Sequence, residues 1–142
     1  MMTRRCTQRQ FLLRPDPDTV QTYLYVLVLA AQLAEVDLIY AMTMSNHEHV
    51  ELADPHGARV LFYQYLHELV ARAMNCLRGR FENFWATEQT SVVRLVTVDD
   101  LIEKIVYSAT NPVTAGLAAR VDRRQGGRGV ERDAAVAPQA AR

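Results

Sequence analysis

The chain has few cysteines and no excess of positive charge. Its 142 residues include two cysteines, Cys6 and Cys76, which lie far apart and form no CxxC pair. They support neither a disulfide framework nor a zinc knuckle, and they fit a reducing cytoplasm. Sixteen basic and sixteen acidic residues leave no net charge. This balance excludes a strongly basic, histone-like binder that depends on charge alone.

Long hydrophobic runs are also missing. The longest extends from Tyr23 to Ala34, which is too short to cross a bilayer. No small-residue cleavage site follows it, so it is not a signal peptide. We therefore expect a cytoplasmic protein with no membrane segment.

The composition is that of a folded domain, because 49% of the residues are hydrophobic and 23% are charged. Residues 121–142 differ, since they are rich in Gly, Arg and Ala and have few large apolar side chains. Such a segment cannot bury enough surface to offset its ordering entropy. The sequence predicts one domain at 1–120, with a boundary near Arg120, and a disordered tail at 121–142.

Periodicity and capping signals predict seven elements in the order β-α-β-β-α-β-α. They are a strand at Phe11–Leu13, a helix capped by Asp16 or Asp18, strands at Leu38–Met44 and His47–Leu52, a helix at Leu61–Leu77 stopped by Gly79, a strand at Ser91–Val96, and a helix from Thr97 that Pro112 ends. This order is typical of an α+β fold of ferredoxin-like type, an antiparallel sheet with helices packed on it. The expected core face of the last helix is Leu101, Ile102, Ile105, Val106 and Ala109.

His47 and His49 are the first candidates for chemistry. Side chains at i and i+2 of a strand point to the same face, so the two imidazoles are within reach of one metal ion. Two surface histidines without a role are the alternative. Spacing alone favours that alternative, because short motifs occur by chance.

Tyr107 and Asn111 are the second candidates. A spacing of four places them on one helical face, opposite the expected apolar face. Tyrosine on a polar helix face is usually only amphipathic surface, and Asn before Pro is usually only a helix terminator.

A third group combines arginines with the aromatic residues Phe81, Phe84 and Trp85 that follow them, and its candidates for DNA binding are Arg72, Arg78, Arg80 and Trp85. Such residues pair with phosphates and stack on unpaired bases, although aromatic residues at this density are more often core. The remaining histidines, His56 and His67, are expected to be solvated, and Cys76 is expected to be a small core residue.

Three segments together resemble one family. Residues 41–50, with Ser45-Asn46-His47-Glu48-His49, resemble the M-P/S-N-H-x-H segment of the REP-associated tyrosine transposases, which belong to the HUH group of single-strand DNA nucleases. Residues 106–117 resemble the Y-x-x-x-N-P-V-x-A-G-L block of these proteins, and residues 79–85 resemble a further block between the two. The resemblance covers roughly residues 3–120. Two spaced motifs, the histidine segment and the tyrosine block, are more specific in the right order than either motif alone.

The resemblance implies a site and a reaction. His47, His49 and Asn111 would bind a divalent metal, Mn²⁺ or Mg²⁺, and Tyr107 would be the nucleophile on single-stranded or hairpin DNA. The products would be a 5′-phosphotyrosyl DNA and a free 3′-hydroxyl. A chain that has lost cleavage and only binds single strands is the alternative, and a metal hydrolase with an activated water is another.

Glu48 departs from the family pattern, which has a bulky apolar residue between the two histidines. A carboxylate that points into the core is costly unless it is paired or protonated.

Overall fold

Four antiparallel strands form one sheet in the computed structural model, which describes residues 1–114. The strands are β1 (Met2–Arg5), β2 (Asp37–Met44), β3 (His47–Ala53) and β4 (Ser91–Val92), and their order in the sheet is β2-β3-β1-β4. All three strand pairs are antiparallel. The expected boundary at Arg120 and the tail at 121–142 lie outside the described residues.

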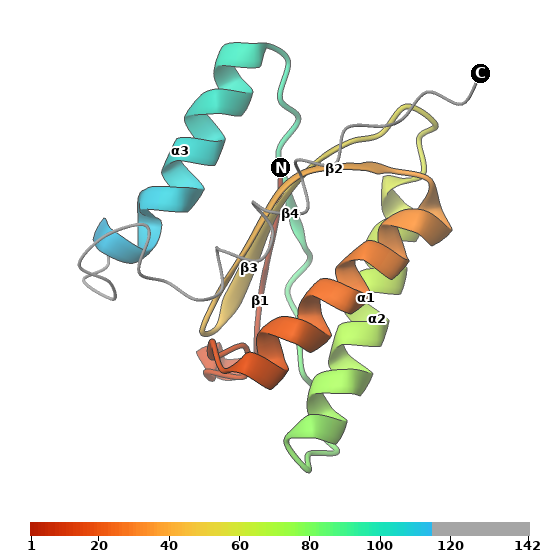
Figure 1. Cartoon of the computed structure of the whole chain (residues 1–142), viewed down its shortest axis with the longest axis vertical. Coiled ribbons are helices and arrows are strands. Elements are labelled where there is room, and N and C mark those ends of the chain that lie inside the picture. Colours follow the sequence, from red (N-terminus) through yellow and green to blue (C-terminus); the bar gives the residue numbers. More distant parts are fainter. Residues whose placement is uncertain (115–142) are drawn as a thin grey trace.

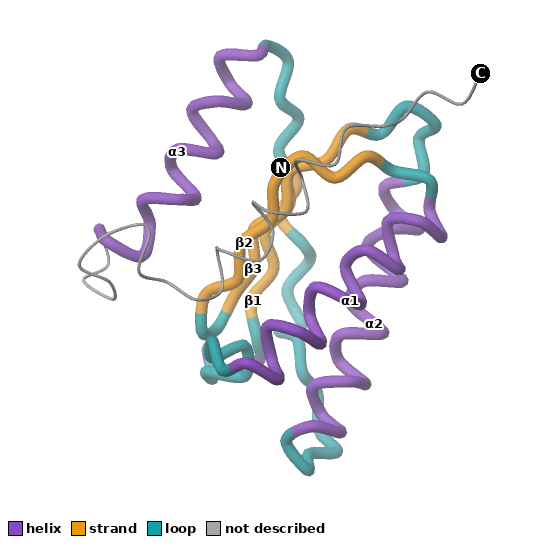
Figure 2. Tube along the Cα trace, viewed as in Figure 1, coloured by secondary structure: helices purple, strands orange, loops and turns teal. Residues whose placement is uncertain are grey.

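Helices cover both faces of this sheet (Figures 1 and 2). The helices α1 (Pro17–Ala34) and α2 (Arg59–Leu77) pack side by side on one face, and α3 (Val98–Thr114) lies on the other. A short 3-10 helix, η1 (Thr7–Arg9), follows β1. The α+β class predicted from the sequence is confirmed. None of the helices in residues 1–114 is long and apolar enough to span a membrane.

The hydrophobic core fills the space between the sheet and the pair α1 and α2. Its fully buried members come from both layers and include Met2, Leu27, Val50, Phe62 and Leu66. We call this side of the sheet the α1/α2 face and the other side the α3 face. Alternate residues of β3 point to the two faces, so Glu48 and Val50 lie on the first, and His47, His49 and Glu51 on the second.

Several helix ends follow the sequence signals. Asp16 caps α1, because its carboxylate accepts the Thr19 N–H at 2.8 Å. Gly79 follows α2 with a φ of 61°, a left-handed conformation that suits glycine. At the start of α3 the Asp100 N–H donates to Thr97 Oγ1 at 3.1 Å, and the Thr97 N–H donates back to Asp100 at 3.0 Å. This is the predicted capping box.

Three predicted element boundaries were wrong. The first strand is Met2–Arg5, and Phe11–Leu13 lies in a turn instead. The strand expected at Ser91–Val96 keeps only Ser91 and Val92. Pro112 does not end α3, which continues to Thr114. A proline inside a helix removes one hydrogen bond to the residue four before it, and here the cost falls only on the last turn.

The packing of two helices also differs from the expectation. Ile102 and Val106 are both 54% exposed, whereas Ser108 is fully buried. The side of α3 that meets the sheet is therefore rotated away from these two residues, towards Ser108. On α2 the side chain of Cys76 is exposed rather than buried in the core.

Candidate metal and nucleophile site

His47 and His49 lie side by side on the α3 face of the sheet. Their ring centroids are 5.0 Å apart, and the ring planes meet at 77°. His49 is 5% exposed and His47 is half-buried. The predicted strand thus brings the two imidazoles together, as the i and i+2 spacing requires.

Each imidazole has a polar neighbour at its Nδ1 atom. His47 Nδ1 lies 2.7 Å from Asn46 Oδ1. Because an amide oxygen only accepts, Nδ1–H is the donor, and the Nε2 atom of neutral His47 carries the lone pair. His49 Nδ1 lies 3.0 Å from the Thr3 hydroxyl of β1. A histidine that binds a metal usually has its other nitrogen held in this way.

The Nε2 atom of His49 is buried and has no hydrogen-bond partner among the described residues. Burial lowers the pKa of His49 to about 4, with smaller contributions from the charges of His47 and Arg5. The ring is therefore neutral at physiological pH, and when its Nδ1–H donates to the Thr3 hydroxyl the lone pair lies on the buried Nε2. An unpartnered buried polar atom is uncommon in native proteins, and an imidazole in this state is a suitable ligand for a divalent metal.

Tyr107 of α3 lies next to this pair. Its ring centroid is 6.4 Å from that of His49, and its side chain is 55% exposed. Lys104 Nζ lies 6.0 Å from the centre of the same ring. The phenol is thus on the histidine side of the sheet and accessible from outside, a position from which a nucleophile can act.

Asn111 follows Tyr107 by one helical turn and is half-buried. Within residues 1–114, no three His, Cys, Asp or Glu side chains are grouped closely enough to hold a metal. A third protein ligand for the histidine pair would therefore be a different residue type, and the amide oxygen of Asn111 is a suitable kind of donor.

Glu51 also lies on the α3 face, two residues after His49. It is fully buried, and its Oε1 accepts a hydrogen bond of 3.2 Å from the Ser108 hydroxyl. The other oxygen, Oε2, has no partner among the described residues. Burial raises the pKa of this carboxyl to about 7. The bond to Ser108 attaches α3 to the sheet at the residue next to Tyr107.

Glu48 points to the α1/α2 face and is fully buried there. Both of its oxygens are bonded, since Tyr23 Oη donates to Oε2 at 2.7 Å and His67 Nε2 donates to Oε1 at 3.0 Å. This satisfies the condition that a buried carboxylate be paired. The departure from the family pattern is therefore compatible with a stable fold.

His67 was expected to be solvated, and this prediction was wrong. It is 8% exposed because the buried side of α2 is centred on Phe62, Leu66 and Val70, which turns His67 inwards. Arg4 Nη1 lies 3.5 Å from His67 Nδ1. A guanidinium only donates, so Nδ1 is the acceptor and Nε2–H is left to bond Glu48.

The four residues predicted to bind DNA do not form one exposed surface. Arg78 is internally bonded, to the Leu12 carbonyl at 2.8 Å and to the Thr19 hydroxyl at 2.7 Å. Trp85 is 8% exposed, and its indole N–H donates to the backbone of His67. Burial argues against DNA contacts by these two residues and favours the alternative that Trp85 is core.

The side chains of Arg72 and Arg80 are more exposed than those of Arg78 and Trp85. The side chain of Arg72 is 75% exposed and pairs with Glu68. The side chain of Arg80 is 24% exposed and lies 3.7 Å from Glu82. A DNA contact by these two arginines stays a prediction.

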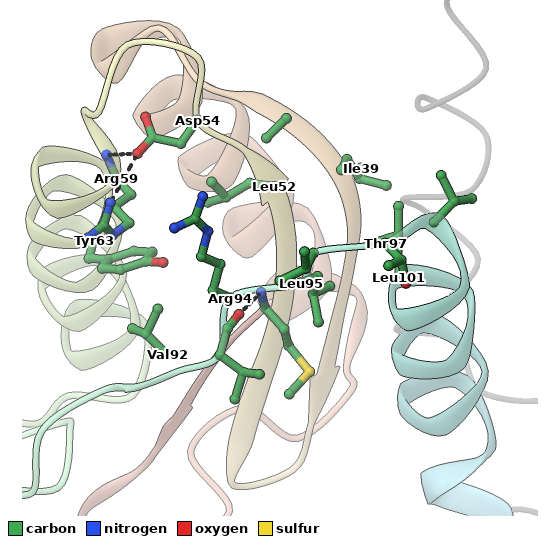
Figure 3. Close-up of a pocket in the computed structure, with 15 residues that line it drawn as sticks. Ile39, Leu52, Asp54, Arg59, Tyr63, Val92, Arg94, Leu95, Thr97 and Leu101 are labelled. Carbon is green, nitrogen blue, oxygen red and sulfur yellow. Dashed lines mark hydrogen bonds and ion pairs between the residues drawn. The ribbon is translucent and has the colours of Figure 1, made fainter.

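A cavity of about 900 Å³ lies at the other end of the sheet (Figure 3). It is lined by apolar side chains such as Leu52, Val92 and Leu95, together with Tyr63 and Arg94. Neither the histidine pair nor Tyr107 lines it. This cavity is therefore separate from the candidate chemistry.

Sequence reasoning missed the contribution of β1 to the site. Thr3 lies opposite His49 and Arg5 lies opposite His47 in the antiparallel ladder. Side chains directly opposite each other share a face, so both point to the α3 face. The sequence Met2-Thr3-Arg4-Arg5 has no apolar alternation, and four residues are too few for a clear period.

Two comparisons with known proteins found no match, and a third found matches at the level of structure. No protein-family model matches the chain, and no curated protein matches it. A candidate transposase from Deinococcus radiodurans R1 is 17% identical, with a TM-score of 0.55 over 74% of this chain and 85% of that one. A REP-associated tyrosine transposase bound to a REP hairpin is 15% identical, with a TM-score of 0.57 over 84% of this chain and 69% of that one. The chain therefore has the fold of these transposases, which is the fold that the sequence resemblance predicted.

Proposed function

We propose that the chain is a metal-dependent transposase that cleaves and joins single-stranded or hairpin DNA, with Tyr107 as its nucleophile. One observation carries the proposal: an accessible phenol lies 6.4 Å, ring to ring, from a neutral imidazole whose buried Nε2 has no partner within residues 1–114. The similar structure that holds a REP hairpin supports DNA of this kind as the substrate.

The residues that would hold the metal are His47, His49 and Asn111. Two nitrogens and one amide oxygen suit Mn²⁺ better than Mg²⁺, because Mg²⁺ prefers an all-oxygen set. When bound, a divalent metal would polarise the phosphate and neutralise the charge that builds up on its oxygens. Asn46 and Thr3 would orient the two rings through their hydrogen bonds to Nδ1.

Tyr107 would act by attacking the phosphorus of the scissile phosphodiester. Its Oη loses a proton as the P–Oη bond forms, and the P–O3′ bond breaks. The 3′-oxygen leaves, takes up a proton and becomes a free hydroxyl. A phosphodiester bond is conserved in the 5′-phosphotyrosine intermediate, so a later attack by a 3′-hydroxyl rejoins strands without a nucleotide cofactor.

The test is formation of a covalent adduct that survives denaturation. Purified protein is mixed with labelled hairpin DNA carrying unpaired flanks, in Mn²⁺ or in EDTA. We expect an adduct only with Mn²⁺, and Tyr107→Phe should abolish it. Tyr25→Phe is the matched control, because Tyr25 is an exposed tyrosine on α1.

Two results would overturn the proposal in different directions. Cleavage that persists in Tyr107→Phe would identify a hydrolase that uses an activated water. Binding of single strands that ignores both EDTA and His49→Ala, with no adduct in the wild-type chain, would identify a binding module.

A further inference from the structure

Arg5 is a cation at the edge of the candidate site with no assigned role. It ends β1 and lies directly opposite His47 in the ladder. Opposite residues of an antiparallel pair have their Cβ atoms about 5 Å apart and on the same face. The guanidinium therefore belongs to the α3 face, beside the two imidazoles, and its charge is one of the causes that lower the pKa of His49.

The neighbouring Arg4 shows what an arginine with a structural role looks like in this strand. Arg4 points to the α1/α2 face, donates to the Thr90 hydroxyl at 2.7 Å and lies over the Trp85 ring at 5.8 Å. Arg5 is exposed, and its side chain makes no hydrogen bond or ion pair within residues 1–114. Its donors are therefore available to a molecule that approaches the site.

A cation in this place does not help to hold a metal, because like charges repel. An anion that contacts the guanidinium and the metal site together would suit this position. The planar guanidinium presents paired N–H donors that match two phosphate oxygens, and it keeps its charge at all relevant pH values.

We infer that Arg5 binds the phosphate that Tyr107 attacks, donating to a non-bridging oxygen. This inference rests on the proposed function and adds a substrate-binding residue to it. The guanidinium faces the oxygens on which negative charge grows as the P–Oη bond forms, so it stabilises the transition state more than the ground state. No proton passes through Arg5, and its contribution is electrostatic.

The first test measures DNA binding without metal. A mixed-sequence single-stranded oligonucleotide is titrated with wild-type protein and with Arg5→Ala in EDTA, over a series of salt concentrations. Each phosphate contact contributes about 0.7 to the slope of log K against log salt for single strands. We expect Arg5→Ala to lower the slope by about that amount, whereas an unchanged slope would overturn the inference.

The second test separates phosphate binding from a structural role. In Mn²⁺, the rate of Tyr107-dependent adduct formation should fall about 10²-fold in Arg5→Ala, the typical cost of removing one donor to a developing charge. Arg5→Lys should recover part of the rate, because it keeps the charge but loses the paired donors. Arg94→Ala, at the cavity end of the sheet, should leave the rate unchanged.

Mn²⁺ affinity distinguishes phosphate binding from a structural role, because Arg5→Ala would weaken Mn²⁺ binding if Arg5 supported the structure of the metal site. Removing a positive charge should leave Mn²⁺ binding as tight as in the wild type, or tighter. Wild-type adduct rates in Arg5→Ala, or a rate that falls only as Mn²⁺ affinity falls, would overturn the inference and leave the proposed function standing. A wild-type chain that forms no adduct but shows the Arg5-dependent salt slope would overturn the proposed function and support the phosphate contact.

Discussion

Both faces of β3 carry buried ionisable side chains, but the two faces differ in how completely these side chains are hydrogen-bonded. On the α1/α2 face, Glu48 is fully buried and both of its oxygens are bonded, by Tyr23 and His67. On the α3 face, His49 and Glu51 are also buried, yet each has one polar atom without a partner in the described part of the chain. Burial is thus similar, and the difference lies in hydrogen bonding.

Under the proposed function, this difference separates a structural network from a metal site. A buried polar group that lacks a partner loses the full energy of its former bonds to water, about 1–3 kcal/mol. On the α1/α2 face Glu48 does not incur this cost, because Tyr23 and His67 supply the partners. On the α3 face the cost persists until something else supplies the partner, and a metal ion at His49 Nε2 would do so.

The largest effect on stability is expected on the α1/α2 face. Glu48→Ala leaves the Tyr23 hydroxyl and the His67 N–H without an acceptor and opens a cavity in the core. We expect the free energy of unfolding to fall by about 3–5 kcal/mol, measured by urea denaturation. Glu48→Gln should lose less because it keeps an acceptor oxygen. A change within about 0.5 kcal/mol for Glu48→Ala would show that the network contributes nothing.

A pH-dependent effect is expected on the α3 face from Glu51. Burial raises the pKa of this carboxyl from 4.5 to about 7, so the folded chain keeps the proton that the unfolded chain loses. Its contribution to stability is complete below pH 4.5 and declines as the pH rises towards 7, by at most about 3 kcal/mol. The stability difference between wild type and Glu51→Gln in EDTA should therefore vary with pH over this window. A difference that is constant from pH 4 to pH 8 contradicts this assignment.

A smaller effect is expected where α3 attaches to the sheet. Ser108→Ala removes the 3.2 Å hydrogen bond to Glu51, which contributes about 1 kcal/mol. Because Ser108 adjoins Tyr107, the adduct rate should fall as well. Thr110→Ala is the control, since that exposed hydroxyl donates to the backbone of its own helix at Val106. Equal effects of the two substitutions would show that the Ser108 contact has no special role.

The elements that carry the two faces were partly predictable from the sequence, because they follow from local patterns. The turn at Ser45-Asn46 and the alternation of His47 to Leu52 predicted β3, and a period of two then places His47 and His49 on one face. Asp16 and the Thr97–Asp100 pair predicted two helix starts, because capping depends on residues only three apart.

Other features depend on contacts between distant positions and were not predictable in this way. No local pattern connects Glu48 with Tyr23 on α1 or with His67 on α2. Likewise, β1 has two arginines in four residues, and only its place between β3 and β4 explains why it is a strand. The rotation of α3 is set by where it meets the sheet, and its own apolar residues indicated a different side.

The central claim is that the α3 face, and not the α1/α2 face, binds a metal. Isothermal titration with Mn²⁺ tests it in three proteins: wild type, His49→Ala and His67→Gln, the last of which keeps a side-chain donor towards Glu48. We predict one Mn²⁺ site in the wild type, a loss of affinity of at least about 100-fold in His49→Ala, and unchanged affinity in His67→Gln. A wild-type chain that binds no Mn²⁺, or equal losses in the two histidine variants, would contradict the account.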